Sequence, residues 1–159
     1  LEFGPKRSLS LVYLEDDSVL DKVAMRIAND FSVYDQEACF SPQHLFVIGG
    51  GGSLHAADGS QFVDSPQFPA EWKPGALAAR DYLNVIKEEK DLKWTFLSPA
   101  LEMHQGTSGE RKGTYRKGSD TPVFDENNRS IISVEDMAIA IADEVEQKQH
   151  IQQRFTVAY

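Results

Sequence analysis

The sequence predicts a single α/β domain in which a mostly parallel sheet has helices packed on both faces. Two observations predict this fold. Short apolar runs of strand length alternate along the chain with segments of helical periodicity, and this alternation is typical of three-layer α/β folds. The composition is that of an ordinary globular protein, with 159 residues of which 41% are hydrophobic and 26% charged, so one core is expected. The apolar runs predict about four to six strands.

The expected strands are apolar runs that stop at a charge, a glycine or a proline. They are residues 8–14 (SLSLVYL), 44–48 (HLFVI), 94–97 (WTFL) and 154–159 (RFTVAY). The second run leads into four consecutive glycines, and a strand that delivers a glycine-rich loop is how α/β folds build a ligand crevice. A short hairpin is also expected, in which residues 113–117 pair with 122–124 across a turn at 118–121.

Three helices are expected from apolar residues at helical spacing. The first begins near Ser18 and runs for about 15 residues. The second begins at Pro74, which fits the first turn of a helix, and runs to about Lys90. The third begins after Ser133, which forms a capping-box pattern with an acidic residue three positions later. Residues 53–74 show no periodicity, so an exposed loop over one face is expected there.

The charge and the cysteine content exclude several functions. A formal net charge of −9 and a pI near 4.8 disfavour nucleic acid as a partner, because phosphate binding needs a clustered cationic surface.

The sequence has no apolar run long enough to span a membrane and no secretory leader at its start, so a cytoplasmic protein without a membrane partner is expected. The single cysteine, Cys39, cannot form an intramolecular disulfide. The chain begins with Leu1 rather than methionine, so we expect a fragment or a processed product.

The residues from Ile48 onward carry a first family resemblance. Its motifs are IGGGGSL at 48–54, the segment from FVDSPQFP to TFLSPA at 62–100, GTYRKG at 113–118, VFDENNRSIISVEDMAIAIADEVE at 123–146 and HIQQRFTVAY at 150–159. They resemble the C-terminal half of NmrA-like, atypical short-chain dehydrogenases, a group of NAD(P)-binding reductases that includes NADH-flavin reductase-like proteins. The resemblance implies an incomplete, three-layer Rossmann-like sheet and NAD or NADP as cofactor.

In that family the glycine-serine loop ends a strand of the sheet, and a Ser-Pro pair after the next strand lies against the nicotinamide. The resemblance therefore implies a set of cofactor-binding residues, which are Gly49, Gly50, Gly51, Gly52, Ser98 and Pro99. No metal site is expected.

Residues 3–47 carry a second resemblance. The motif DQEACFSPQ at 35–43 is similar to the catalytic-cysteine segment of the long-chain acyl-CoA reductase of bacterial luminescence, a relative of aldehyde dehydrogenases. The resemblance implies that Cys39 stands where that family has a nucleophile that forms an acyl thioester. The alternative is a buried or idle thiol, because the acidic base and the cofactor domain of an aldehyde dehydrogenase are not visible in the sequence.

The two resemblances meet near Ile48, and we therefore expect a chimeric or recombined chain. An NmrA-like enzyme begins with a strand, a GxxGxxG turn and a helix that together hold the cofactor pyrophosphate, and the sequence contains no such turn.

We expect an NAD(P)-binding oxidoreductase-like protein that is catalytically impaired, with a small acceptor such as a flavin or a quinone. One alternative is a non-catalytic α/β module that forms a homodimer through an exposed sheet edge. Another is an acyl-CoA reductase fragment that acts through Cys39.

Two further residues are candidates for catalysis. Ser53 either donates a hydrogen bond to the substrate at the mouth of the glycine loop or satisfies its own backbone. His104 occupies a place that resembles the histidine facing the nicotinamide in related flavin and biliverdin reductases, and the alternative is an exposed loop histidine. Several cations are candidates for meeting a phosphate, although charged loop residues are more often only solvated. They are Lys73, Arg111, Lys112, Arg116 and Lys117.

Overall fold

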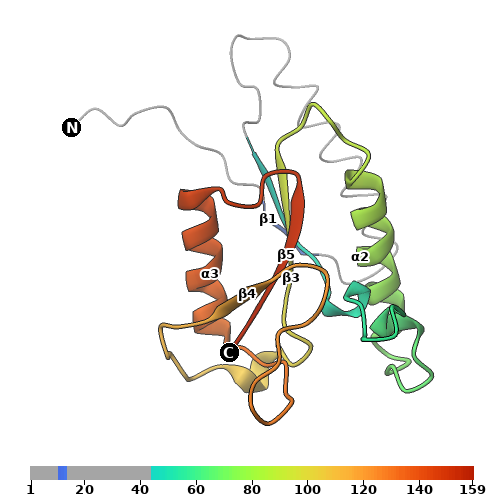
Figure 1. Ribbon diagram of the computed structural model, residues 1–159, viewed down its shortest axis with the longest axis vertical. Helices are drawn as coiled ribbons and strands as arrows, with labels where there is room; N and C mark the ends of the chain where they lie inside the picture. Colours follow the sequence, from blue (N-terminus) through green and yellow to red (C-terminus); the bar gives the residue numbers. More distant parts are fainter. Residues whose placement is uncertain (1–10, 14–43) are drawn as a thin grey trace.

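The computed structural model describes residues 11–13 and 44–159, which form a five-stranded sheet flanked by two long helices (Figure 1). The strands are β1 (Leu11–Tyr13), β2 (Leu45–Ile48), β3 (Trp94–Ser98), β4 (Arg116–Gly118) and β5 (Gln153–Ala158). The long helices are α2 (Lys73–Ile86) and α3 (Val134–Gln147). Short 3-10 helices are η1 (Gly51–Ser53), η2 (Phe62–Asp64) and η3 (Gln105–Thr107). The helix expected after Ser18 lies outside the described residues.

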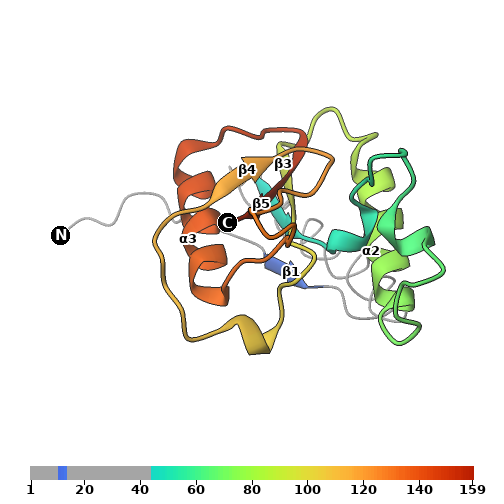
Figure 2. The same ribbon diagram turned by 60° about the horizontal axis from the view of Figure 1, so that its bottom comes forward.

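The sheet has the strand order β1-β2-β3-β5-β4. The first four strands in this order run parallel, and β4 is antiparallel to β5. Parallel neighbours need a crossover connection, and α2 provides it between β2 and β3. The helices α2 and α3 lie on opposite faces of the sheet (Figures 1 and 2). The prediction of a mostly parallel, Rossmann-like α/β sheet is confirmed.

The strand β2 is buried on both faces and divides the core in two. Its side chains alternate between the faces, as in any strand. Phe46 and Ile48 belong to the cluster that includes residues of α3, whereas Leu45 and Val47 belong to the cluster that includes residues of α2. A parallel strand that is covered on both faces has a continuous apolar sequence rather than an alternating one. This explains why the strand carries no polar position.

Both long helices begin at or next to the predicted residues. The Oγ of Ser133 caps α3 by accepting a hydrogen bond from the N–H of Asp136 at 3.1 Å, and α2 has its proline in the first turn. The helix α2 ends at Ile86, before the predicted Lys90, because the N–H of Glu88 bonds the carbonyl three residues back at 3.1 Å and tightens the last turn. No helix in the described residues is long and apolar enough to cross a membrane.

Two loop predictions differ from the structure. The predicted hairpin is wrong, because β4 pairs with β5 and residues 122–124 form no strand. The longer strand β5 offers β4 an edge to pair with, while Pro122 has no N–H to donate to a ladder. The segment 53–74 was expected to be exposed. It does carry exposed turns, but Leu54 and Val63 are fully buried, so this loop packs onto the domain.

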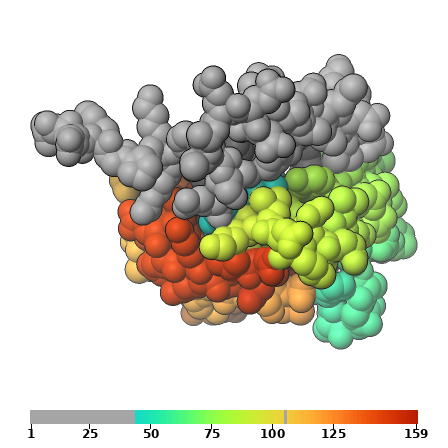
Figure 3. Space-filling model, turned by 90° about the horizontal axis from the view of Figure 1, so that it is seen from above, coloured from blue at the N-terminus to red at the C-terminus, as the bar shows by residue number. Residues whose placement is uncertain are grey.

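Polar side chains close the end of the sheet at which β3 and β5 begin. Figure 3 shows the turn after α3 (red) against the segment that leads into β3 (yellow-green), and Gln152 Nε2 joins the two by donating to the carbonyl of Lys90 at 2.7 Å. The fully buried carboxylate of Glu144 contacts both the backbone N–H and Nδ1 of His150 at 2.7 Å, and Lys117 Nζ at 3.5 Å. A buried carboxylate needs such partners.

We expect Gly49→Ala to destabilise the fold. A Cβ at Gly49 would lie 2.0 Å from Cζ of the buried Phe96 ring, whereas at Gly50 the nearest atom would be the Cβ of Ala79, at 3.7 Å. Overpacking should lower the free energy of unfolding of Gly49→Ala by about 1–3 kcal/mol, and Gly50→Ala, the matched control, should lose less than about 0.5 kcal/mol. Urea denaturation followed by circular dichroism measures both.

Equal losses in the two variants would contradict this packing argument. A double-mutant cycle with Phe96→Leu adds a second check. Because the smaller side chain relieves the clash, the losses from Gly49→Ala and Phe96→Leu should not add.

Candidate functional site

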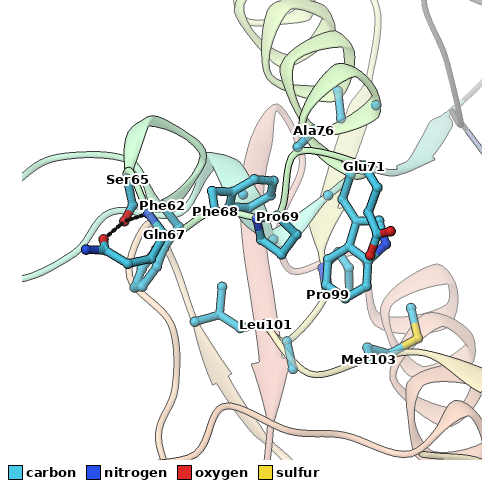
Figure 4. A pocket seen from close by; sticks show the side chains of 18 of the residues that line it. Phe62, Ser65, Gln67, Phe68, Pro69, Glu71, Ala76, Pro99, Leu101 and Met103 are labelled. Carbon is cyan, nitrogen blue, oxygen red and sulfur yellow. Dashed lines mark hydrogen bonds between the residues drawn. The ribbon is translucent and has the colours of Figure 1, made fainter. Parts of the chain in front are cut away.

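A pocket of about 710 Å³ opens where β2 and β3 end, beside the first turn of α2 (Figure 4). Its walls come mainly from the glycine loop after β2, from the loop 62–72 and from residues 99–103 after β3. The volume lies within the range of small-molecule sites. Ligands of open α/β sheets bind at the carboxyl ends of the strands, and the pocket lies at this edge.

The four glycines that were predicted to bind cofactor all line this pocket, namely Gly49, Gly50, Gly51 and Gly52. Their lack of a side chain lets neighbouring segments approach closely. A Cβ on Gly51 would lie 3.0 Å from the carbonyl oxygen of Pro99, and one on Gly52 would lie 3.1 Å from the Cβ of Ala76. The loop is therefore packed between the end of β3 and the start of α2, and it is this close approach that requires glycine.

The predicted Ser-Pro pair is divided between the core and the pocket. Pro99 lines the pocket. Ser98 is fully buried and is not part of the lining, and its Oγ has no hydrogen-bond partner among the described residues. In this geometry Pro99 is the member of the pair that a ligand in the pocket would touch.

Ser53 lies behind the glycine loop and does not line the pocket. The residue is buried, and its Oγ and its carbonyl oxygen accept hydrogen bonds from Nη1 of Arg154 at 3.1 and 2.9 Å. The guanidinium of Arg154 also donates from Nε to Asp120 at 2.8 Å. These bonds anchor the end of the loop. Ser53 Oγ also lies 3.5 Å from the carbonyl oxygen of Gly50, which is the local backbone contact expected as the alternative, and a contact with a substrate stays a prediction. Sequence reasoning missed Arg154, for which the available signal was that it is the one charged residue of the expected strand 154–159.

The other predicted catalytic residues are His104 and Cys39. His104 is exposed, and its Nδ1 accepts a hydrogen bond from the N–H of Gly106 at 3.0 Å. It lines a separate pocket of about 400 Å³, together with Arg129 and Tyr159. The structure therefore shows a loop histidine outside the main pocket. Cys39 lies outside the described residues.

None of the five cations that were predicted to meet a phosphate lines the main pocket. Three of them have other partners. Lys112 Nζ lies 3.7 Å from the centroid of the Tyr159 ring. Arg116 donates a hydrogen bond to the carbonyl oxygen of Phe124 at 2.6 Å. Lys117 donates a hydrogen bond to Oε1 of Gln149, just after α3, at 2.9 Å. In residues 11–13 and 44–159, no three His, Cys, Asp or Glu side chains gather as metal ligands.

Asp136 joins α3 to the end of the chain and to the loop before β4. Its carboxylate is fully buried and accepts hydrogen bonds from Tyr159 Oη at 2.5 Å, from the N–H groups of Lys112 and Gly113 at 2.9 Å and from Ser133 Oγ at 3.2 Å. Burial by itself raises the pKa of this carboxyl, but the hydrogen bonds outweigh it, so the pKa lies below its ordinary value. The folded protein therefore favours the charged form.

Known proteins of two kinds are similar to this chain. The family Acyl-CoA reductase (LuxC) matches residues 1–56. The long-chain acyl-protein thioester reductase of Aliivibrio fischeri is 47% identical over 49 residues, which are 31% of this chain and 10% of that protein. The uncharacterized protein YwnB of Bacillus subtilis (strain 168) is 39% identical over 115 residues, which are 71% of this chain and 53% of that protein.

Two solved structures resemble most of the chain. A protein of Bacteroides thetaiotaomicron, provisionally named an epimerase, has a TM-score of 0.78 and 35% identity over 95% of this chain and 66% of its own. A protein of Streptococcus pneumoniae TIGR4, provisionally named an NADH-flavin reductase, has a TM-score of 0.70 and 30% identity over 87% of this chain and 66% of its own. The structural neighbours are thus oxidoreductase-like and epimerase-like proteins.

The two resemblances that the sequence predicts are confirmed, and together they are consistent with a chimeric chain. The chain spans about half the length of YwnB and about a tenth of the thioester reductase. It spans 66% of each of the two solved structures. The general kind of protein to which the larger part is similar is an oxidoreductase with a Rossmann-like fold.

We expect Asp136→Asn to destabilise the protein in a pH-dependent way. Loss of the buried charge should lower the free energy of unfolding by about 1–3 kcal/mol at neutral pH. The folded pKa lies below the ordinary value of 3.8, so this stabilisation is complete above that value and is lost as the pH falls through the folded pKa. Urea unfolding between about pH 7 and about pH 3 should show the variant and the wild type converging on acidification.

The exposed Glu126 supplies the control. Glu126→Gln also removes one negative charge and should leave the stability within about 0.5 kcal/mol of the wild type at each pH. A difference between Asp136→Asn and the wild type that stays constant with pH would contradict the assigned role of the carboxylate.

Proposed function

We propose that this chain carries the substrate side of a nicotinamide-dependent reductase site of the NmrA-like, atypical short-chain dehydrogenase type. In this proposal the pocket at the ends of β2 and β3 binds a small flat acceptor such as a flavin or a quinone. The observation that carries the proposal is that the glycine loop, Pro99 and aromatic side chains line one pocket. The similarity to a protein named for NADH-flavin reduction supports the same kind of acceptor.

The loop 62–72 gives the pocket its aromatic wall. Phe62, Phe68 and Trp72 all line it, and Figure 4 shows Phe62 and Phe68 with Leu101 and Met103 of the segment after β3. Trp72 lines the pocket and is 59% exposed, so its side chain is only partly packed against the protein. Aromatic faces stack on planar rings, and an exposed aromatic residue at a concave site favours ligand binding.

We further infer that the chain by itself binds NAD or NADP weakly and transfers hydride poorly. A dinucleotide site holds the pyrophosphate with main-chain N–H groups at a glycine-rich turn between a strand and a helix. The 159 residues contain no GxxGxxG turn. By the family resemblance, the nicotinamide would lie against the glycine loop and Pro99, which supports binding of this half of the cofactor only.

Titration with whole and half cofactors tests this inference. NADH, NADPH and reduced nicotinamide mononucleotide are each titrated into the protein, and fluorescence energy transfer from Trp72 to the reduced nicotinamide is measured. The same titrations with Trp72→Phe show which part of the signal comes from Trp72. We expect dissociation constants of about 1 mM. The constants for NADH and NADPH should be less than about tenfold lower than the constant for the mononucleotide, which lacks the adenylate half. A micromolar constant for NADH, about 100-fold tighter than for the mononucleotide, would reveal a complete dinucleotide site and overturn the inference.

Titration with acceptors tests the pocket. Riboflavin and menadione should bind saturably to the wild type, and Trp72→Ala should weaken that binding by about tenfold through loss of stacking. The matched control is Val85→Ala on α2, which removes an exposed apolar side chain outside the pocket and should leave binding unchanged. If the wild type binds neither compound, the acceptor pocket is refuted.

A second candidate function is thioester formation at Cys39, which is favoured by the match of residues 1–56 to the acyl-CoA reductase family. In this reaction the cysteine thiolate attacks the acyl carbonyl and displaces the thiolate of coenzyme A. Intact-mass spectrometry after incubation with a long-chain acyl-CoA is the test. A gain of one acyl group in the wild type and none in Cys39→Ser would support it, and no gain in the wild type would end this candidate.

A further inference from the structure

The pocket at the ends of β2 and β3 carries almost no charge. Among the described residues that line it, Glu71 has the one formal charge, and no lysine, arginine or histidine is present. Most of the other side chains are apolar, with Phe68 and Leu101 among those drawn in Figure 4. Such a lining favours burial of an apolar ring and offers no counter-charge to an anion.

The hydroxyl group of Ser65, which lines the pocket, already forms hydrogen bonds with Gln67. Ser65 Oγ donates to Oε1 of Gln67 at 2.6 Å and accepts a hydrogen bond from the N–H of Gln67 at 3.2 Å, as the dashed lines in Figure 4 show. Because a hydroxyl has one hydrogen to donate, an anion in the pocket would have to compete with Gln67 for it.

Two arginines of neighbouring segments do not line the pocket and are paired with other groups. Arg80 on α2 pairs with Asp64 at 3.0 Å, and Arg154 lies behind the glycine loop with Ser53 and Asp120. Among the described residues that line the pocket, none would therefore offer a phosphate an opposite side-chain charge, and Glu71 would offer a like one. Like charges at close range repel, and the repulsion is stronger near a protein surface than in bulk water.

We propose that this pocket selects an uncharged fused-ring acceptor over the phosphorylated form of the same ring, and that Glu71 sets the preference by repelling anions at the rim. The inference rests on the proposed acceptor function and adds the charge class of the acceptor. Riboflavin and flavin mononucleotide share one ring system and differ by a phosphate, so this pair isolates the effect. Riboflavin is the preferred ligand of the two.

Binding of both flavins to the full chain is measured by quenching of flavin fluorescence at about 0.01 M ionic strength, where charges act over about 30 Å. The wild type should bind riboflavin about 5–10-fold more tightly than flavin mononucleotide. Glu71→Gln should strengthen binding of flavin mononucleotide by about fivefold and leave riboflavin unchanged. Glu88→Gln removes an exposed negative charge outside the pocket and should leave the ratio of the two constants as it is.

Ionic strength separates charge repulsion from a lack of space for the phosphate. At about 0.5 M salt the wild-type ratio should fall toward one, because screening weakens the repulsion, whereas a steric barrier would keep the ratio constant. A constant ratio, or one that Glu71→Gln does not change, overturns charge selection and leaves the acceptor pocket standing. If riboflavin, flavin mononucleotide and menadione all fail to bind the wild type, the acceptor function itself is overturned.

Discussion

The pocket depends on the contact between Gly49 and the ring of Phe96. With no side chain at Gly49, the chain leaving β2 lies directly on the neighbouring strand, where a Cβ would come within 2.0 Å of the ring. The same lack of a side chain at Gly51 and Gly52 lets the loop approach the end of β3 and the start of α2. These contacts fix the strand ends and the helix relative to one another. The pocket is the space left between them.

The sheet also joins segments that are similar to two kinds of protein. The strands β1 and β2 lie within residues 1–56, which match the acyl-CoA reductase family, and β3 lies beyond them. Even so, β2 pairs in parallel with β3 in a register that aligns Phe46 with Thr95 and Ile48 with Leu97. A parallel ladder is made of main-chain N–H and C=O groups, which every sequence supplies. Because β2 is apolar at each position, it can be covered on both faces whatever the origin of its neighbour.

The elements that local patterns encode were predictable. The strands β2, β3 and β5 follow from apolar runs, and the start of α3 follows from the capping pattern of Ser133, because these signals lie within a few residues of one another. In the candidate site, the glycine loop was indicated by the strand that leads into it and strengthened by family resemblance, and Pro99 came from the resemblance alone. The structure places both around one pocket.

The features that sequence reasoning missed depend on contacts between distant residues. For Ser53 the sequence left a substrate contact and a local backbone contact open, and neither included its bond to Arg154, which lies 101 positions later in the chain. The edge that β4 pairs with is likewise supplied by β5, far beyond the turn that suggested a hairpin. A local pattern carries no information about such partners, since tertiary packing decides them.

The two ends of the strands hold different kinds of structure. Where β3 and β5 begin, Glu144, His150 and Gln152 form polar contacts that tie the turns together. At the opposite end, the loop 62–72 forms one wall of the pocket. Random changes in that wall would leave the polar contacts intact, so a library diversified there could be selected for new small-molecule specificities on a constant scaffold.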